Sequence, residues 1–344
     1  MKPGAQDFNL LAACCVLLVF SCAIVPGSAA RIPTADDPTV ACLRSRGLPE
    51  GFAPRTKSGM TLVPAGSVVL GSQGGYADEA PSGERIVIAA FWIDRTEVTN
   101  AQFSEFVKAT GYVTDAEREG ASAVFKAPKK SDRSRRDGDW WQWIQGANWR
   151  MPEGPSSAAR AQPNEPVVQV TQHDALAYAK WMGRDLPSEA EWEYAAAGGG
   201  RQELVDRQPR DPKGRPVANY WQGIFPDVNT KEDGFVALAP VGCFPKNGYG
   251  LADMIGNAWE LTRDRYTGGH QAHGNGDPWQ TAKSAGAKTH DSERLVIKGG
   301  SFLCAENYCM RYRVTAREAQ EADLATSHVG FRTVLRVGAA PSAR

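Results

Sequence analysis

Residues 299–309 read Gly-Gly-Ser-Phe-Leu-Cys-Ala-Glu-Asn-Tyr-Cys, and Arg-Tyr-Arg follows at 311–313. The stretch lies in the part of the chain after Gly200, where helix and strand signals nearly vanish and turns, short strands and clusters of Asn, Asp and Gly take over. With 35 Gly, 22 Pro and 10 Trp in 344 residues, the composition predicts a loop-rich fold held by large aromatic side chains. Loops of this length are uncommon in compact domains unless they are functional or held by something else, and bound metal ions are the natural candidate.

Regular elements are predicted mainly in the first half of the chain. Thr99 or Asn100 can cap a helix that ends at Gly111, and a capping box begins at Ser188. Alternating apolar residues and turn residues predict a hairpin and two further strands. The predicted helices lie at 99–111, 171–183 and 188–200, the hairpin at 60–71 and the strands at 85–88 and 91–94.

The N-terminal segment, residues 1–30, has the pattern of an export signal. One base, Lys2, precedes an apolar run at 10–25, and small residues before Arg31 offer a cleavage site. The run is shorter than the roughly 20 apolar residues of a membrane span. We expect cleavage near Ala30, with a retained anchor or lipid attachment as the alternatives. The mature chain is then expected to be exported to the periplasm, the medium or the endoplasmic reticulum lumen, without stable membrane association.

Charge and composition also bear on partners and order. The net charge is zero and the basic residues are scattered, which predicts no nucleic-acid partner. The basic run at 129–137 is interpreted as a solvated loop. Pro33, Gly51 and the Asp-Asp-Pro sequence at 36–38 predict a weakly ordered lead-in over 31–57. We expect the protein to act as a monomer.

The thiol pair in the quoted stretch allows several interpretations. Three of the seven cysteines lie in the N-terminal apolar run, which leaves Cys42, Cys243, Cys304 and Cys309. Spacing alone favours a small disulfide between Cys304 and Cys309 over catalytic redox use. A zinc site lacks further Cys or His ligands at suitable spacing. A two-coordinate thiolate site suits a soft monovalent metal such as Cu(I).

Two acidic segments offer oxygen ligands of the kind that calcium prefers. They are 219–221 with 232–235, and 253–260. Spacing alone favours ordinary turn residues, because Asn and Asp beside Gly are common in turns. The five histidines are dispersed, and His173 is expected at an exposed or capping position at the start of a helix. No nucleophile elbow or phosphate-binding glycine loop is present in the sequence.

Taken together, these motifs resemble those of formylglycine-generating enzymes over residues 59–336. The Leu-Pro-Ser-Glu-Ala-Glu-Trp-Glu block at 186–193 marks the whole superfamily, including non-catalytic members. The pair Cys304 and Cys309 is the narrower marker, which separates catalysts from paralogues. Further matching segments are 96–100, 146–149, 165–168, 247–251, 256–260, 316–317 and 330–332.

The resemblance implies an irregular, loop-rich α+β fold related to C-type lectins, formed by a single domain at 58–338 with a tail at 339–344. It implies an oxidase that converts the cysteine of a Cys-x-Pro-x-Arg segment in an unfolded sulfatase to Cα-formylglycine, using O2 and Cu(I). Cys304 and Cys309 would hold the copper. Ser301 and Trp259 would line the pocket for O2 and the substrate thiol.

Two structural calcium ions are also implied by the resemblance. One would be bound by the side chains of Glu97, Asn219 and Asp233 and by the carbonyl oxygens of Tyr220 and Phe235. The other would be bound by Asp253 and Glu260 and by the carbonyl oxygens of Gly256 and Ala258.

The chain departs from the family pattern between the two cysteines. The family carries His-x-Ser there, whereas this chain has Ala305-Glu306-Asn307. The family's Asn near position 328 is His328 here. These differences affect the substrate groove more than the copper ligands. The alternative function is a non-catalytic lectin-like binding or assembly module of the same fold. A related enzyme that forms C–S bonds is disfavoured, because it needs a His-rich iron-binding domain.

Overall fold

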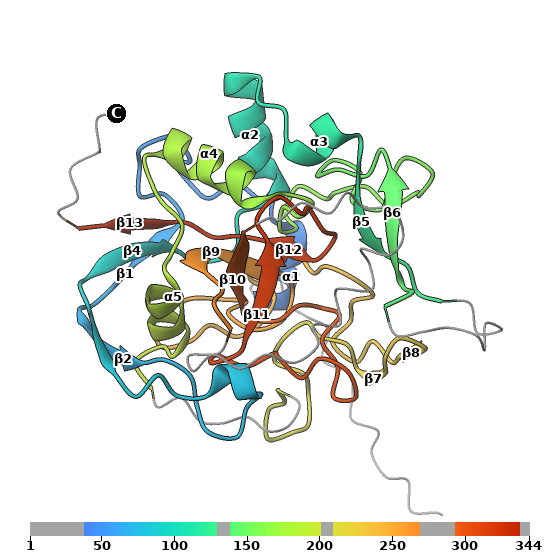
Figure 1. The fold of residues 1–344 in the computed structure, drawn as a ribbon. Coiled ribbons are helices and arrows are strands. Elements are labelled where there is room, and N and C mark those ends of the chain that lie inside the picture. The colour runs from blue at the N-terminus through green and yellow to red at the C-terminus, as the bar shows by residue number, and fades with distance from the viewer. Residues whose placement is uncertain (1–37, 129–137, 201–208, 269–292, 338–344) are drawn as a thin grey trace, which may run out of the picture.

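The computed structural model describes residues 38–128, 138–200, 209–268 and 293–337 of the chain. The predicted signal segment at 1–30, the basic run at 129–137 and the tail at 339–344 lie outside these residues. Short helices and short strands are joined by long irregular segments (Figure 1). This arrangement confirms the predicted loop-rich α+β fold.

Five α-helices and one short 3-10 helix lie in the described ranges. Thr99, Thr171 and Ser188 each begin a helix with a capping box, in which the side chain accepts a backbone N–H and the third helical residue bonds back. The three predicted helices are therefore confirmed. No helix in these ranges is long and apolar enough to span a membrane. The helices are α1 (Pro38–Arg44), η1 (Ala77–Glu79), α2 (Asn100–Thr110), α3 (Asp115–Glu119), α4 (Gln172–Met182) and α5 (Glu189–Ala196).

Three strands form a sheet in which the sequence predicted a local hairpin. Strand β1 (Met60–Val63) pairs with β4 (Phe91–Asp94), which also pairs with β13 (Val334–Arg336). Strand β2 (Gly66–Val69) pairs instead with β3 (Arg85–Ile88). The hairpin at 60–71 was therefore wrong, although the strands were correctly placed. A local pattern shows that a segment is extended, but it does not show which distant strand will cover it.

A four-stranded sheet lies at the centre of the molecule, in the half that had few strand signals (Figure 1). Its antiparallel strands are strongly buried, and residues 259–262 at the start of β9 are all buried. A strand buried on both faces shows no alternation of polar and apolar residues, so its sequence carries little strand signal. The order is β11 (Arg317–Glu321), β10 (Arg294–Lys298), β9 (Trp259–Arg265) and β12 (Val329–Gly330), with β12 parallel to β9.

Three two-stranded elements complete the described strands. One is β2 with β3, described above. Strand β5 (Ala121–Phe125) pairs with β6 (Trp141–Gln145), and β7 (Gly223–Ile224) pairs with β8 (Val228–Asn229). The last two ribbons lie on the same side of the molecule in Figure 1.

The largest core cluster is built from aromatic side chains between α2, α4 and the central sheet. Phe103 is fully buried, and its ring stacks on Tyr178 with centroids 5.9 Å apart. Trp149 and Phe331 meet Phe103 edge to face at 5.2 and 6.4 Å. Cys304 belongs to the same buried cluster. The thiol loop is therefore anchored directly in the main core.

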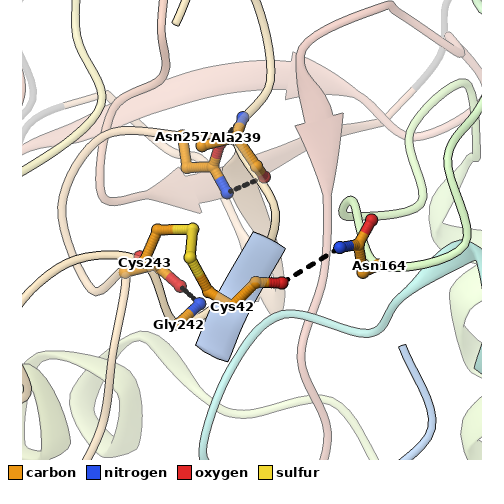
Figure 2. Close-up of a disulfide and its surroundings, with 7 residues drawn as sticks. Cys42, Asn164, Ala239, Gly242, Cys243 and Asn257 are labelled. Carbon is orange, nitrogen blue, oxygen red and sulfur yellow. Dashed lines mark hydrogen bonds between the residues drawn. A yellow bond between two sulfur atoms is a disulfide. The ribbon is translucent and has the colours of Figure 1, made fainter. Parts of the chain in front are cut away.

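A disulfide joins α1 to the second half of the chain. Cys42 and Cys243 are bonded although 201 residues separate them, and both are buried (Figure 2). Asn164 donates a hydrogen bond from Nδ2 to the Cys42 carbonyl at 3.0 Å. The amide of Arg55 bonds to the Met182 carbonyl at 3.0 Å. The expectation of weak order at 31–57 is thus corrected for residues 38–57, because a cross-link and long-range hydrogen bonds hold them.

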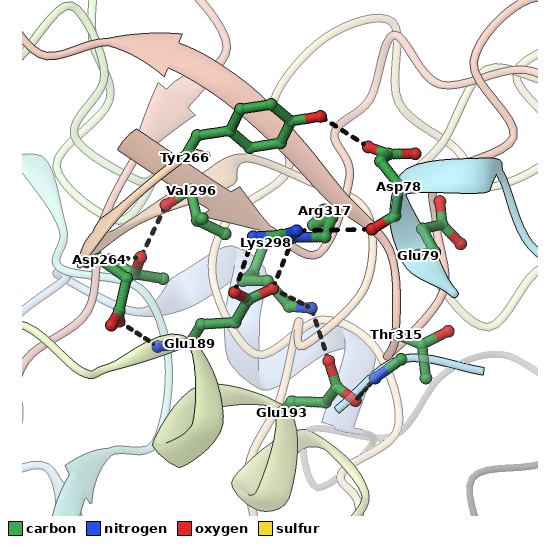
Figure 3. Close-up of polar contacts among 12 residues, drawn as sticks. Asp78, Glu79, Glu189, Glu193, Asp264, Tyr266, Val296, Lys298, Thr315 and Arg317 are labelled. Atoms are coloured by element: carbon green, nitrogen blue, oxygen red, sulfur yellow. Dashed lines mark hydrogen bonds and ion pairs between the residues drawn. The ribbon is translucent and has the colours of Figure 1, made fainter. Parts of the chain in front are cut away.

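A buried ion network joins α5 to the central sheet (Figure 3). The Lys298 ammonium lies 2.8 Å from Glu193 and 3.6 Å from Glu189, and Lys298 and Glu193 are fully buried. Arg317 pairs with Glu189 at 2.9 Å. The other oxygen of Glu193 accepts the Gly71 amide at 2.8 Å. Each charge is paired and hydrogen-bonded, which is the condition for keeping ions in a protein interior.

Candidate active site and metal centres

The two thiols of the quoted stretch lie side by side as free cysteines. Their sulfur atoms are 2.9 Å apart, beyond the roughly 2.05 Å of a disulfide bond. Cys304 is buried, whereas Cys309 is partly exposed. The structure therefore has two reduced thiols at this position, and the disulfide favoured by spacing alone is not formed.

Backbone geometry before Cys304 explains the paired glycines. Gly300 has φ of +77°, and a Cβ there would lie 2.8 Å from the Arg311 carbonyl oxygen, so any side chain would clash. The Phe302 amide bonds to the Asn257 carbonyl at 2.9 Å, and the Cys304 amide bonds to the Ser301 carbonyl at 2.9 Å. The turn places the Ser301 amide 3.4 Å from the Cys304 sulfur, as a hydrogen-bond donor to it.

The thiols differ in acidity because one donates a hydrogen bond to the other. Burial opposes ionisation of Cys304, but hydrogen bonds from the Cys309 thiol and the Ser301 amide, with the charge of Arg311, lower its pKa below the ordinary value. The hydrogen bond to Cys304, then burial, raises the pKa of Cys309 well above its ordinary value. The pair thus favours one shared proton, which a soft cation would displace on binding.

Ser301 and Trp259 both lie beside the thiols, but both are buried. Ser301 is fully buried and its hydroxyl accepts the Leu303 amide at 3.3 Å. Trp259 begins β9, is 2% exposed and belongs to the core cluster that contains Cys304. The structure therefore brings these predicted residues to the thiol loop as supporting side chains rather than as an open surface.

Sequence reasoning missed two tyrosines beside the thiols. Burial, followed by the charges of Cys309 and Cys304, raises the pKa of Tyr308. Burial and then the charge of Cys304 raise the pKa of Tyr312. Both rings lie within reach of the sulfur charges and remain protonated phenols. Their presence in the stretch 299–313 was the available signal.

The chain on the other side of Cys309 is fixed by a residue more than 200 positions away. The Met310 amide donates to the Tyr76 hydroxyl at 3.2 Å, and the Arg311 guanidinium lies 4.3 Å from the centre of the Tyr76 ring. Arg311 also pairs with Asp78 at 2.8 Å and with Glu318 at 3.1 Å. No local pattern around Tyr76 predicted this contact.

The second predicted calcium site coincides with a buried carboxylate cluster. The side chains of Asp253 and Glu97 contact each other, and Glu260 acts on both through its charge. Arg332 donates twice to Glu260, each time at 2.6 Å, and Trp192 donates to it at 2.7 Å. Burial, then the charge of Asp253, raises the pKa of Glu97 well above its ordinary value. The cluster has an excess of carboxylates over cations.

Two oxygens of this cluster have no hydrogen-bond donor among the described residues. They are Oε2 of Glu97 and Oδ1 of Asp253. The other oxygen of Asp253 accepts the Gly242 amide at 2.6 Å, and the other oxygen of Glu97 accepts Asn257 Nδ2 at 3.0 Å. Asp253 and Asn257 both have φ near +57°, so the loop holds this shape against an unfavourable backbone conformation. Two orphaned, buried acid oxygens fit a hard divalent cation.

Glu97 therefore belongs with Asp253 and not with the ligand set in which the sequence analysis placed it. Its nearest charges are Asp253, Arg332 and Glu260. The sequence grouping was wrong on this point because the β4–α2 connection carries Glu97 to the 253–260 loop. Ala258 is buried in that loop, and Gly256 packs so closely that a Cβ would lie 2.2 Å from the Asn219 carbonyl oxygen.

The first predicted calcium site fits an ion less well. Asp233 accepts the Phe235 amide at 2.9 Å on one oxygen, and the Tyr220 amide at 3.2 Å and Gln222 Nε2 at 2.7 Å on the other. Asn219 donates to the Ala237 carbonyl at 2.8 Å. The structure brings these residues together, but N–H donors occupy the acid oxygens, as in a hydrogen-bonded turn.

Two other features do not extend the site. His173 is exposed, as expected, and its ligand atom lies within 4.8 Å of those of Asp115 and Asp174. Arg118 already pairs with Asp115, so a cation there would compete with a guanidinium. A surface pocket of about 490 Å³ lies between the start of α2 and Trp149, and none of the predicted site residues lines it.

Comparison with known proteins identifies the family. The profile of the "Sulfatase-modifying factor enzyme 1-like domain" matches residues 46–337. The chain belongs to this family. It is 44% identical over 291 residues to the formylglycine-generating enzyme of Mycobacterium tuberculosis, across 79% of this chain and 96% of that protein. The resemblance noted from the sequence motifs is confirmed.

Two further relatives bear on activity and fold. The chain is 36% identical over 289 residues to the inactive C-alpha-formylglycine-generating enzyme 2 of Mus musculus, across 81% of this chain and 86% of that protein. The solved structure of PvdO from Pseudomonas aeruginosa aligns with a TM-score of 0.51 at 21% identity, covering 83% of this chain and all of PvdO. The latter similarity supports the fold alone.

Proposed function

We propose that this protein is a formylglycine-generating oxidase. It converts the cysteine of a Cys-x-Pro-x-Arg segment in an unfolded sulfatase to Cα-formylglycine, with O2 as oxidant and Cu(I) held by Cys304 and Cys309. The observation that supports this best is the pair of free thiols 2.9 Å apart in a chain 44% identical to an enzyme of that name. Two soft sulfur donors, one already disposed to ionise, are a donor set that suits Cu(I).

The residues of the site would each perform a physical task. Bound Cu(I) supplies one-electron chemistry toward O2 and a soft attachment point for the substrate thiol. Cys304 gives up its proton most readily, because the Ser301 amide and the charge of Arg311 stabilise its thiolate. Cys309, partly exposed, faces the side from which a polypeptide arrives. Buried Trp259 and the ring of Tyr308 exclude water from the sulfur atoms.

Mass spectrometry of a Cys-x-Pro-x-Arg peptide tests this proposal directly. Reduced protein with Cu(I) and O2 should exchange the peptide sulfur for oxygen, and a matched peptide with Ala in place of Arg should react more slowly. Cys304→Ser and Cys309→Ser should each lose both conversion and tight Cu(I) binding. Full turnover in either variant would exclude the two-thiolate mechanism.

Two calcium ions and export form the remaining parts of the proposal. The cluster of Glu97 and Asp253, with its orphaned oxygens, supports a structural cation there, with Glu260 and the Gly256 and Ala258 carbonyls around it. Support for the site at Asn219 and Asp233 comes from family membership alone. The disulfide between Cys42 and Cys243 is typical of proteins in oxidising compartments, and it supports export.

A non-catalytic binding module remains the second candidate, because a relative 36% identical to this chain is named as inactive. This function requires that the thiols be dispensable or bridged. The structure has them free, which favours catalysis. Wild-type protein that binds the Cys-x-Pro-x-Arg peptide but never converts it would favour the module.

A further inference from the structure

The thiol loop is tied to the β7–β8 ribbon at three successive points. The Trp221 amide donates to the Cys304 carbonyl at 2.9 Å. The Asn307 side chain accepts the Phe225 amide and donates to the Phe225 carbonyl, both at 3.0 Å. The Tyr308 ring stacks on the Phe225 ring, with centroids 4.4 Å apart and planes at 11°. The ribbon therefore follows the cysteine loop as one unit.

Asn307 makes a contact that its chemistry suits well. Its amide group satisfies both the N–H and the C=O of one residue, as the partner strand in a β-ladder does. An Asp of the same shape keeps the acceptor but lacks the donor, and its charge faces a carbonyl oxygen. A Ser is shorter and has one hydroxyl for the two groups. Asn307 is therefore the residue that sets the position of the ribbon against the thiols.

The ribbon exposes apolar side chains on its surface. Ile224 and Val228 are directly paired across it, and their side chains are 62% and 43% exposed. Opposite residues in an antiparallel pair present their side chains on the same face. A ribbon of two residues per strand has no stability of its own, so its position depends on the contacts to the thiol loop. The exposed pair is thus held beside the cysteines without a partner among the described residues that covers it.

We propose that Ile224 and Val228 bind an apolar side chain of the substrate, in the extended segment that flanks the reacting cysteine, and that Asn307 is the positioning residue for this contact. The inference rests on the proposed function. The occupant is an unfolded polypeptide because the surface continues directly from the loop that carries Cys309, the more accessible thiol. Unfolded chains expose the apolar residues that such a surface can bury.

A peptide series measures the contact. A single Leu replaces Ser at each position flanking Cys-x-Pro-x-Arg, and kcat/KM is compared with that of the all-Ser peptide. At one flanking position wild-type protein should prefer Leu by about tenfold, the size expected for partial burial of a leucine. Ile224→Ser with Val228→Ser should reduce this preference to about twofold or less. Val87→Ser, which changes an equally apolar and 82% exposed residue on β3, is the matched control and should keep it.

The positioning role of Asn307 has its own readout. Asn307→Asp should lower the Leu preference at the same position while Cu(I) affinity stays that of wild type. Asn307→Gln, which retains both amide functions on a longer chain, should recover part of it. Loss of Cu(I) binding together with the Leu preference would show a general loosening of the loop and would overturn the assignment.

Binding of a peptide with Ser in place of the reacting cysteine separates this inference from the proposed function. Fluorescence anisotropy should show tighter binding of the Leu peptide to wild type and equal binding of both peptides to the Ile224 and Val228 variant. If the Leu preference in binding is absent, or survives that variant, the inference fails even where conversion succeeds. If the variant instead dissolves a dimer seen by sedimentation, the surface binds a second copy and the inference is wrong. Binding with the expected preference but no conversion would refute only the oxidase function.

Discussion

Replacing Asp253 by Asn tests whether the buried carboxylate cluster is built for a cation. Asn keeps an acceptor for the Gly242 amide, which now bonds to Asp253 at 2.6 Å. Its new amide hydrogens face the orphaned oxygen of Glu97. In chelator, the substitution therefore removes a buried charge and adds a hydrogen bond. We expect the variant to be more stable than wild type under these conditions.

The magnitude follows from the acidity of Asp253. Burial raises its pKa from 3.8 to about 6, and the Gly242 amide and Arg332 offset only part of the effect. Each pKa unit is worth about 1.4 kcal/mol, so the ionised group destabilises the cation-free folded state by about 3 kcal/mol at pH 7.5. Because the folded state holds this proton more tightly than the unfolded chain, the free energy of unfolding falls as pH rises from about 4 to about 6.

The assay is thermal unfolding of both proteins in chelator and in calcium, at pH 5 and pH 7.5. In chelator at pH 7.5 the variant should melt about 6 °C above wild type, at roughly 2 °C per kcal/mol for a domain of this size. The difference should shrink at pH 5, where wild-type Asp253 is protonated. In calcium the order should reverse, because wild type gains the binding free energy and the variant has lost a charged ligand.

Asp233→Asn is the matched control for this experiment. Asp233 uses both oxygens as acceptors of backbone and side-chain N–H groups, so its variant should be less stable with and without calcium. An Asp253→Asn protein that is less stable than wild type in chelator at pH 7.5 would refute the electrostatic argument. Equal calcium responses of wild type and Asp253→Asn would refute the cation site.

Three further predictions concern the scaffold. Replacing Cys42 and Cys243 by Ser removes a cross-link across 201 residues and should lower the free energy of unfolding by about 2–4 kcal/mol, measured in guanidinium; an unchanged midpoint would contradict it. Lys298→Met leaves buried Glu193 without its 2.8 Å partner and should cost about 3–5 kcal/mol, whereas adding Glu193→Gln should restore much of it; equal melting temperatures of the two variants would refute this. Burial lowers the pKa of His328 from 6.5 to about 3, so stability should fall as pH drops below 6.5 while the ring stays neutral; an NMR titration near pH 6.5 would disprove it.

The sequence by itself determined the features that depend on neighbours within a few residues. Thr99, Thr171 and Ser188 each cap a helix through bonds to the third helical residue, so the signal is complete within one turn. The same holds for the thiol loop, where Gly300 and Ser301 shape the turn that brings Cys304 to Cys309. The family motifs, which combine such local signals, were sufficient to indicate the fold.

Only the tertiary structure decided which distant segments meet. Strand β1 could have paired with β2, but β4 offered it a central position in a sheet. The disulfide of Cys42 with Cys243, and the contact of Glu97 with Asp253, join residues more than 150 positions apart. Such contacts are chosen by the burial of whole surfaces and by the pairing of charges away from water. Both depend on the assembled core and leave no periodic trace in the chain.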